Sequence, residues 1–110
     1  MKPPYIPSRI RLGPYCVDII LGDTKTSLLG EYNPNESQIT ISKNCPPHLI
    51  VVTLWHEIFH AMLDASSLVG LFSDKQTEAL CDCLGTWMAS LTQQGVVNLK
   101  EPKDESAGTD

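Results

Sequence analysis

The sequence predicts an α+β fold, in which a small, mostly antiparallel sheet of about three strands is followed by two packed helices. Two observations lead to this prediction. Before residue 45, short β-branched segments alternate with turn-rich segments, which is the pattern of strands and hairpins. After residue 45, two long segments contain no interior Pro and carry helix boundary signals.

The strands are expected in the first half of the chain. Residues 15–21 (YCVDIIL) are β-branched and apolar with one charge, which favours a strand. Residues 28–42 are predicted to form a β-hairpin, because LLGEY and SQITIS flank the turn-rich segment NPNE. In SQITIS, Ile39 and Ile41 alternate with polar residues, as in a half-buried strand. We therefore expect residues 37–42 at an edge of the sheet.

The two helices have clear boundary signals. Pro46 and Pro47 suit the first turn of a helix that runs over residues 48–65. Apolar residues occupy almost every side of this segment, so we expect it to be buried in the middle of the domain. Ser73 and Gln76 form a capping-box signature that opens a second helix over residues 74–94. The core side of the second helix is expected to carry Leu80, Leu84, Trp87, Met88 and Leu91.

Length and composition favour one domain over residues 1–99. Residues 1–14 are Pro-rich and expected to be extended, and residues 100–110 are polar and expected to be disordered. The net charge is −5 and the eight basic residues are scattered, so we expect no nucleic-acid partner. No apolar run is long enough to span a membrane, so we expect no membrane association.

The cysteines and the N-terminus indicate the compartment. The four cysteines, Cys16, Cys45, Cys81 and Cys83, form no CxxC pair and no secreted-type framework, so we expect free, buried thiols in a reducing cytosol. The N-terminal residues show no secretory signal, which favours a cytoplasmic location. The sequence carries no signal of oligomeric state.

Residues 53–63 (TLWHEIFHAML) carry the strongest functional signal. On a helix, His56 and His60 lie one turn apart on one face, where two imidazole nitrogens can bind one zinc ion. Glu57 is placed to act as a general base without binding the metal. The alternative is a pair of satisfied core histidines beside a surface glutamate. A glutamate in a helix that is apolar on every side would be buried, however, and a metal would account for all three polar groups.

A zinc site needs a third protein ligand. His48 lies eight residues before His56, about 12 Å away along a helix, and is too distant. In the second helix, Glu78 and Asp82 share one face, and the small Gly85 on that face permits close approach to the first helix. We expect Glu78 to bind zinc. Asp82 is expected to accept a hydrogen bond from the far nitrogen of a ligand histidine, His56.

Other assignments stay open at this point. Glu78 and Asp82 could belong to an exposed charged stripe, which is common on helices. Asp64 continues the histidine face by one further turn. In deformylase-like hydrolases an upstream cysteine is the third ligand, and Cys16 and Cys45 are the candidates here.

The segment HEIFH, followed after seventeen residues by EALCD, resembles the gluzincin arrangement HExxH…ExxxD. Residues 49–91 are similar to the small ImmA/IrrE-type metallopeptidases, many of them encoded by phages and prophages. The resemblance implies a minimal zincin-like domain that binds one zinc ion per chain through His56, His60 and Glu78. It implies Glu57 as the base and Asp82 as the residue that orients the first histidine. The segment EALCDCLG departs from that family's usual pattern of Glu-Ala-Asn or Glu-Ala-Asp followed by Phe-Ala.

These features predict a zinc-dependent metallopeptidase that acts on a protein or peptide, with a narrow regulatory protein as the expected substrate. Zinc activates a water molecule, and Glu57 takes its proton and passes it to the leaving amine. Residues 37–42 would hold the substrate backbone by strand addition. Tyr32 is the candidate oxyanion donor, since no Tyr, His or Arg follows Glu78. The alternative function is a zinc-containing binding or regulatory module with little or no catalysis.

Overall fold

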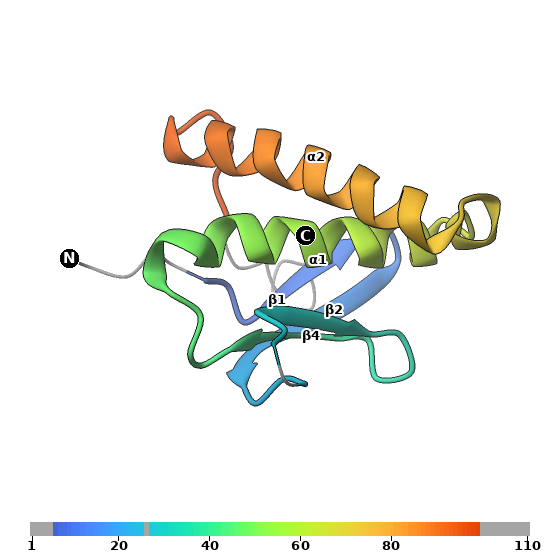
Figure 1. Cartoon of the computed structure of the whole chain (residues 1–110), viewed down its shortest axis with the longest axis horizontal. Coiled ribbons are helices and arrows are strands. Elements are labelled where there is room, and N and C mark those ends of the chain that lie inside the picture. Colours follow the sequence, from blue (N-terminus) through green and yellow to red (C-terminus); the bar gives the residue numbers. More distant parts are fainter. Residues whose placement is uncertain (1–5, 26, 100–110) are drawn as a thin grey trace, which may run out of the picture.

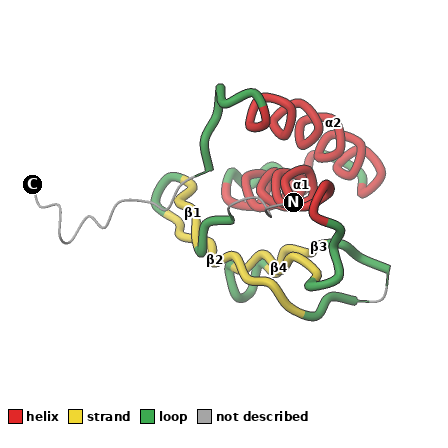
Figure 2. Tube along the Cα trace, turned by 90° about the vertical axis from the view of Figure 1, so that its left-hand side faces the viewer, coloured by secondary structure: helices red, strands yellow, loops and turns green. Residues whose placement is uncertain are grey.

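The chain is layered, with a four-stranded sheet on one side, α1 in the middle and α2 on the outside (Figure 1, Figure 2). The computed structural model describes residues 6–25 and 27–99, so the predicted disordered tail over residues 100–110 lies outside the described residues. The predicted order of a sheet followed by two packed helices is confirmed. The elements are β1 (Arg9–Leu12), β2 (Tyr15–Gly22), β3 (Gly30–Asn33), β4 (Gln38–Ser42), α1 (Pro47–Ala65), the 3₁₀ turn η1 (Val69–Leu71) and α2 (Asp74–Gln93).

The sheet differs from the prediction in strand number and direction. Its four strands follow the order β1-β2-β4-β3, and β2 and β4 run parallel, whereas the two hairpins β1-β2 and β3-β4 are antiparallel. The missed strand, β1, comes from the Pro-rich segment 1–14. Its four residues are too few to show a strand period. The parallel pair joins segments that are distant in sequence, which leaves no local signal.

The strand β4 is interior, so the prediction that residues 37–42 form a sheet edge was wrong. β4 lies between β2 and β3, and its Thr40 and Ser42 are buried together with Ile39 and Ile41. Alternation of apolar and polar residues identifies the two faces of a strand but says nothing about the strands beside it. The edge next to β4 is β3, and the opposite edge is β1.

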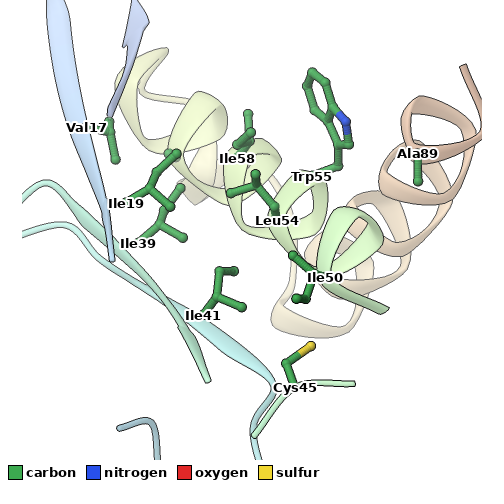
Figure 3. Packing of buried hydrophobic residues seen from close by; sticks show 11 residues of the cluster. Val17, Ile19, Ile39, Ile41, Cys45, Ile50, Leu54, Trp55, Ile58 and Ala89 are labelled. Atoms are coloured by element: carbon green, nitrogen blue, oxygen red, sulfur yellow. The ribbon is translucent and has the colours of Figure 1, made fainter. Parts of the chain in front are cut away.

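The helix α1 supplies the centre of the core. Leu54 and Ile58 are almost wholly buried and point toward Ile19, Ile39 and Ile41 of the sheet (Figure 3). The opposite side of α1 is covered by α2, so α1 is sandwiched between the sheet and the second helix. This arrangement explains why apolar residues surround α1 on every side, and it confirms the predicted central position.

The helix α2 packs on α1 through small side chains. Its buried residues recur every four positions and are Thr77, Cys81, Gly85 and Ala89. The predicted core side of α2 was wrong for Leu84 and Trp87, which are 36% and 66% exposed. Leu80, Met88 and Leu91 are half-buried, and Met88 packs against the core. The spacing of two helix axes depends on the side chains between them, so small residues at the contact bring the helices close and leave larger residues at the rim.

Hydrogen bonds hold both ends of α2. The predicted capping box is confirmed, since the Gln76 backbone N donates to Ser73 Oγ at 3.1 Å and the Ser73 backbone N donates to Gln76 Oε1 at 2.9 Å. Near the other end, Trp55 Nε1 of α1 donates to Thr92 Oγ1 at 2.9 Å. The capping box satisfies backbone groups at the start of α2, and the bond from Trp55 to Thr92 links α2 to α1.

The remaining described residues add no further secondary structure to the core. Val97 and Leu99 pack against it after α2 ends. The four cysteines are free, as predicted. Cys45 and Cys81 are buried, but the expected burial was wrong for Cys16 and Cys83, which are exposed. Across residues 6–25 and 27–99, neither helix has the length and apolar character needed to cross a membrane.

The burial of α1 predicts a large effect for Leu54→Ala. Leu54 has 0% exposure, so truncation would leave a cavity and should lower the free energy of unfolding by about 2–5 kcal/mol. Urea denaturation of both proteins measures the difference. Leu71→Ala is the matched control, because Leu71 is 72% exposed and its truncation should change stability by less than about 0.5 kcal/mol. Equal effects of the two variants would contradict the central position of α1.

Candidate metal centre

The two histidines of α1 face one another across one helical turn. His56 Nε2 lies 3.2 Å from His60 Nε2, and the ring centroids are 4.9 Å apart. Two nitrogens bound to one tetrahedral zinc ion at ordinary Zn–N lengths lie about 3.3 Å apart. The histidine pair therefore has the nitrogen spacing that a single zinc ion requires.

The helix α2 adds a carboxylate to this pair. Glu78 Oε2 lies 2.7 Å from His60 Nε2, and Glu78 Oε1 lies 3.3 Å from His56 Nε2. The three ligand atoms all lie within 4.8 Å of one another. Among the described residues, neither Asp64 nor any cysteine belongs to such a group. Two imidazoles and one carboxylate form a donor set that zinc commonly takes in catalytic sites, so these residues fit the ion.

Asp82 holds the far side of His56. Its Oδ1 lies 2.8 Å from His56 Nδ1, so the carboxylate accepts the hydrogen bond from that nitrogen. This bond places the proton on Nδ1 and leaves the lone pair of Nε2 directed at Glu78 and His60. Asp82 is 73% exposed at its side chain, yet its hydrogen-bond partner is mostly buried.

Burial keeps His60 in the form that a metal needs. Desolvation is the largest effect on its pKa and lowers it, while the nearby Glu78 carboxylate acts in the opposite direction and does not overcome it. A neutral imidazole retains a lone pair for coordination, whereas a protonated one does not. The environment of His60 therefore favours metal binding near neutral pH.

Glu57 is a buried carboxyl group beside the histidines. It is 7% exposed, and its Oε2 lies 4.0 Å from His56 Nε2. Burial raises the pKa of Glu57 to about 7; His56 acts against this rise, and the carboxylates of Glu78 and Glu31 add to it. A carboxyl group with a pKa near neutrality can both accept and return a proton at physiological pH.

Two glycines let α2 and β3 approach α1 closely. The sequence analysis predicted the close approach at Gly85 but not the one at Gly30. At Gly85, an added Cβ would lie 3.1 Å from the backbone N and 3.3 Å from the Cα of His56. At Gly30 of β3, an added Cβ would lie 2.7 Å from Thr53 Cγ2 and 3.3 Å from Glu57 Cγ. The contact at Gly30 was missed, although an isolated glycine inside a strand segment is a signal of a close backbone approach.

Tyr32 lies at the rim of the site but is engaged elsewhere. Its hydroxyl donates a hydrogen bond to Asp64 Oδ2 at 2.9 Å. Burial and this contact with Asp64 raise the pKa of Tyr32 to about 12. Tyr32, the predicted oxyanion donor, and Asp64, the alternative zinc ligand, are therefore hydrogen-bonded to each other.

A cleft of about 510 Å³ opens beside the three ligand residues. One wall consists of residues 27–32, which include most of the edge strand β3, and the other walls come from α1 and α2. Its charged lining residues are Glu31, Glu57, Glu78 and Asp82, and no Lys or Arg of the described residues lines it.

Comparisons of the chain with protein families, curated proteins and solved structures find no match. The function therefore has to be argued from the site itself.

The contact at Gly85 predicts that Gly85→Ala damages the site through the packing of the helices. The new methyl group would press on the backbone of His56, so α2 has to move away from α1 and carry Glu78 and Asp82 with it. We expect a loss of about 1–3 kcal/mol in stability together with weaker zinc binding. Calorimetry and zinc titration measure both. Gly70→Ala is the control, since nothing lies within 4 Å of its added Cβ, and equal zinc affinity in the two variants would contradict this prediction.

The ligand group predicts one zinc ion per chain. Elemental analysis of protein purified without chelator or affinity metal should find it in the wild type. Glu78→Ala should weaken zinc binding by more than about 100-fold, because even the loss of an outer partner of a ligand costs about 10–100-fold. Asp74→Ala removes an exposed acid from the same helix and should retain the zinc. Equal zinc in the wild type and Glu78→Ala would remove Glu78 from the site, and no zinc in either would remove the site itself.

Proposed function

We propose that this protein is a zinc-dependent metallopeptidase of the gluzincin type, similar to the small ImmA/IrrE-type enzymes, and that it hydrolyses peptide bonds. The observation that carries the proposal is the meeting of His56, His60 and Glu78 from two helices, with the buried Glu57 beside them. A purely structural zinc site has no use for a buried carboxyl group that does not bind the metal. The proposed site contains one zinc ion per chain.

In this proposal each residue has a separate task. A bound zinc ion supplies Lewis acidity, which polarises a substrate carbonyl and makes water acidic near neutral pH. His56, His60 and Glu78 hold the ion, and Asp82 keeps His56 in the tautomer that binds it. Glu57 accepts the proton of the attacking water and delivers it to the amine that leaves, so the carboxylate is regenerated after each turnover.

The open edge of β3 is suited to hold the substrate backbone, and it replaces the predicted 37–42 segment in this role. The Ser42 backbone N donates to the Leu29 O at 2.8 Å, and bonded pairs alternate along an antiparallel ladder. By this alternation, Gly30 and Tyr32 direct their N–H and C=O groups away from β4. An extended peptide can pair with these groups alongside the metal centre.

A second candidate function is a zinc-containing binding or regulatory module. One observation favours it: the hydroxyl of Tyr32, the residue expected to stabilise the oxyanion, is bonded to Asp64. Such a module would bind the same extended peptide without hydrolysing it. The two functions differ in their need for Glu57, which the module can lose without consequence.

The proposed base predicts that Glu57→Gln separates zinc binding from catalysis. The amide has the same shape as the carboxylate but cannot take a proton, so hydrolysis should fall by about 10²–10⁴-fold while the zinc content stays the same. Peptide products released from a mixed peptide library, identified by mass spectrometry, measure the activity. Glu36→Gln is the control, because Glu36 lies in the hairpin turn outside the cleft.

The outcomes of this experiment separate the two candidate functions. Hydrolysis that persists in Glu57→Gln would refute the mechanism. No hydrolysis by the zinc-loaded wild type, together with peptide binding that needs zinc, would support the binding module. Hydrolysis by the wild type that stops on chelation and returns with zinc would support the peptidase.

A further inference from the structure

Within the described part of the chain, Glu31 is the one charged residue lining the cleft that neither contacts the histidines nor acts as the proposed base. Glu78 and Asp82 contact the histidines, and Glu57 is the proposed base. The Glu31 side chain forms no hydrogen bond or ion pair with any described residue. It is half-buried at the cleft, where the other charged residues are also acidic. This carboxylate is therefore available to a cation that enters from outside.

The position of Glu31 in the strand determines what it faces. Glu31 is paired with Thr40 of β4, and the bond between Ser42 N and Leu29 O shows that this is a hydrogen-bonded pair. A strand added antiparallel at the other side of β3 then meets Glu31 in a non-hydrogen-bonded pair. In such pairs the Cα atoms are only about 4.5 Å apart and opposed side chains are closest. The substrate residue opposite Glu31 is therefore in direct reach of its carboxylate.

The pleat of β3 gives the direction of this contact. A Cβ at Gly30 points at Thr53 and Glu57 of α1, and the side chain of Tyr32 reaches Asp64 of α1. Successive side chains of a strand alternate between the two faces, so Glu31 projects from the face that is turned away from α1. The substrate residue beside Glu31 lies on that same outer face, and its neighbours in sequence face α1 and the metal centre.

We propose that Glu31 is a specificity residue that selects peptides with Lys or Arg at the position opposite it, a proposal that rests on the peptidase function and its use of the β3 edge. Opposite charges in directly opposed positions of a sheet attract, and like charges in the same positions repel. No Lys or Arg among the described residues lines the cleft, so no basic side chain there competes for the Glu31 carboxylate. The preferred substrate is an extended segment with a basic residue next to one that faces the metal.

Peptide binding to the zinc-loaded Glu57→Gln full-length chain tests the proposal without interference from cleavage. The probes are four fluorescent nonapeptides of one extended, β-branched sequence that differ only at the central position, which is Lys, Arg, Gln or Glu. At low ionic strength the Lys and Arg peptides should bind about five-fold more tightly than the Gln peptide, as expected for a partly exposed ion pair. The Glu peptide should bind more weakly than all three.

Variants of Glu31 decide whether this residue is the cause. Glu31→Gln in the same background should remove the preference, and Glu31→Lys should reverse it, so that the Glu peptide binds best. Glu36→Gln removes one negative charge from the same hairpin outside the cleft and should leave the order unchanged. Thermal unfolding of each variant verifies that it is folded. No preference for basic peptides, an order unaffected by Glu31→Lys, or no measurable binding of any peptide would each overturn the proposal.

Cleavage of the same four peptides by the wild type separates this proposal from the peptidase function. Binding with a Glu31-dependent preference but without any cleavage would refute the peptidase and leave the role of Glu31 in peptide recognition intact. Cleavage of all four peptides at equal rates would support the peptidase and overturn the role of Glu31.

Discussion

The close packing of α2 on α1 at Gly85 is the constraint on which the rest of this structure depends. At this point the backbone of His56 lies where a side chain of α2 would otherwise stand. The helices can therefore approach until Glu78 and Asp82, two turns and one turn before Gly85, reach the two nitrogens of His56. A wider separation would leave the histidines of α1 and the carboxylates of α2 as unconnected polar groups on two helices.

The same packing resolves an energetic conflict inside α1. Over residues 54–63 this helix carries three polar residues, His56, Glu57 and His60, among apolar ones, and it is covered on two sides. Burial of a polar group is unfavourable unless it finds a partner. His56 and His60 find theirs in Asp82 and Glu78, so a hydrogen-bonded cluster forms at the helix interface. Burial is the main reason why the pKa of Glu57 is raised, and it outweighs the opposing effect of His56. In the proposed function this environment is what would make Glu57 a base.

The sheet contributes the third wall of the site through its edge. β3 lies close to α1 because Gly30 has no side chain to separate it from Thr53 and Glu57. An edge strand normally risks unwanted pairing with other chains. Here the strand is short, and Tyr32 is tied to Asp64 of α1, so the unpaired backbone groups are held at the mouth of the cleft. In the proposed function, these unpaired backbone groups of the β3 edge bind the substrate peptide.

The sequence by itself determined the two helices, the β3-β4 hairpin and the candidate residues of the site, because each is encoded by a local pattern. The capping box at Ser73, the four-residue spacing of His56 and His60, and the same spacing of Glu78 and Asp82 require no knowledge of the rest of the chain. Only the tertiary structure decided which strand forms the edge, that β2 and β4 run parallel, and that Trp87 faces outward. These features depend on contacts between segments distant in sequence. A sequence pattern within one segment does not specify which other segments lie beside it.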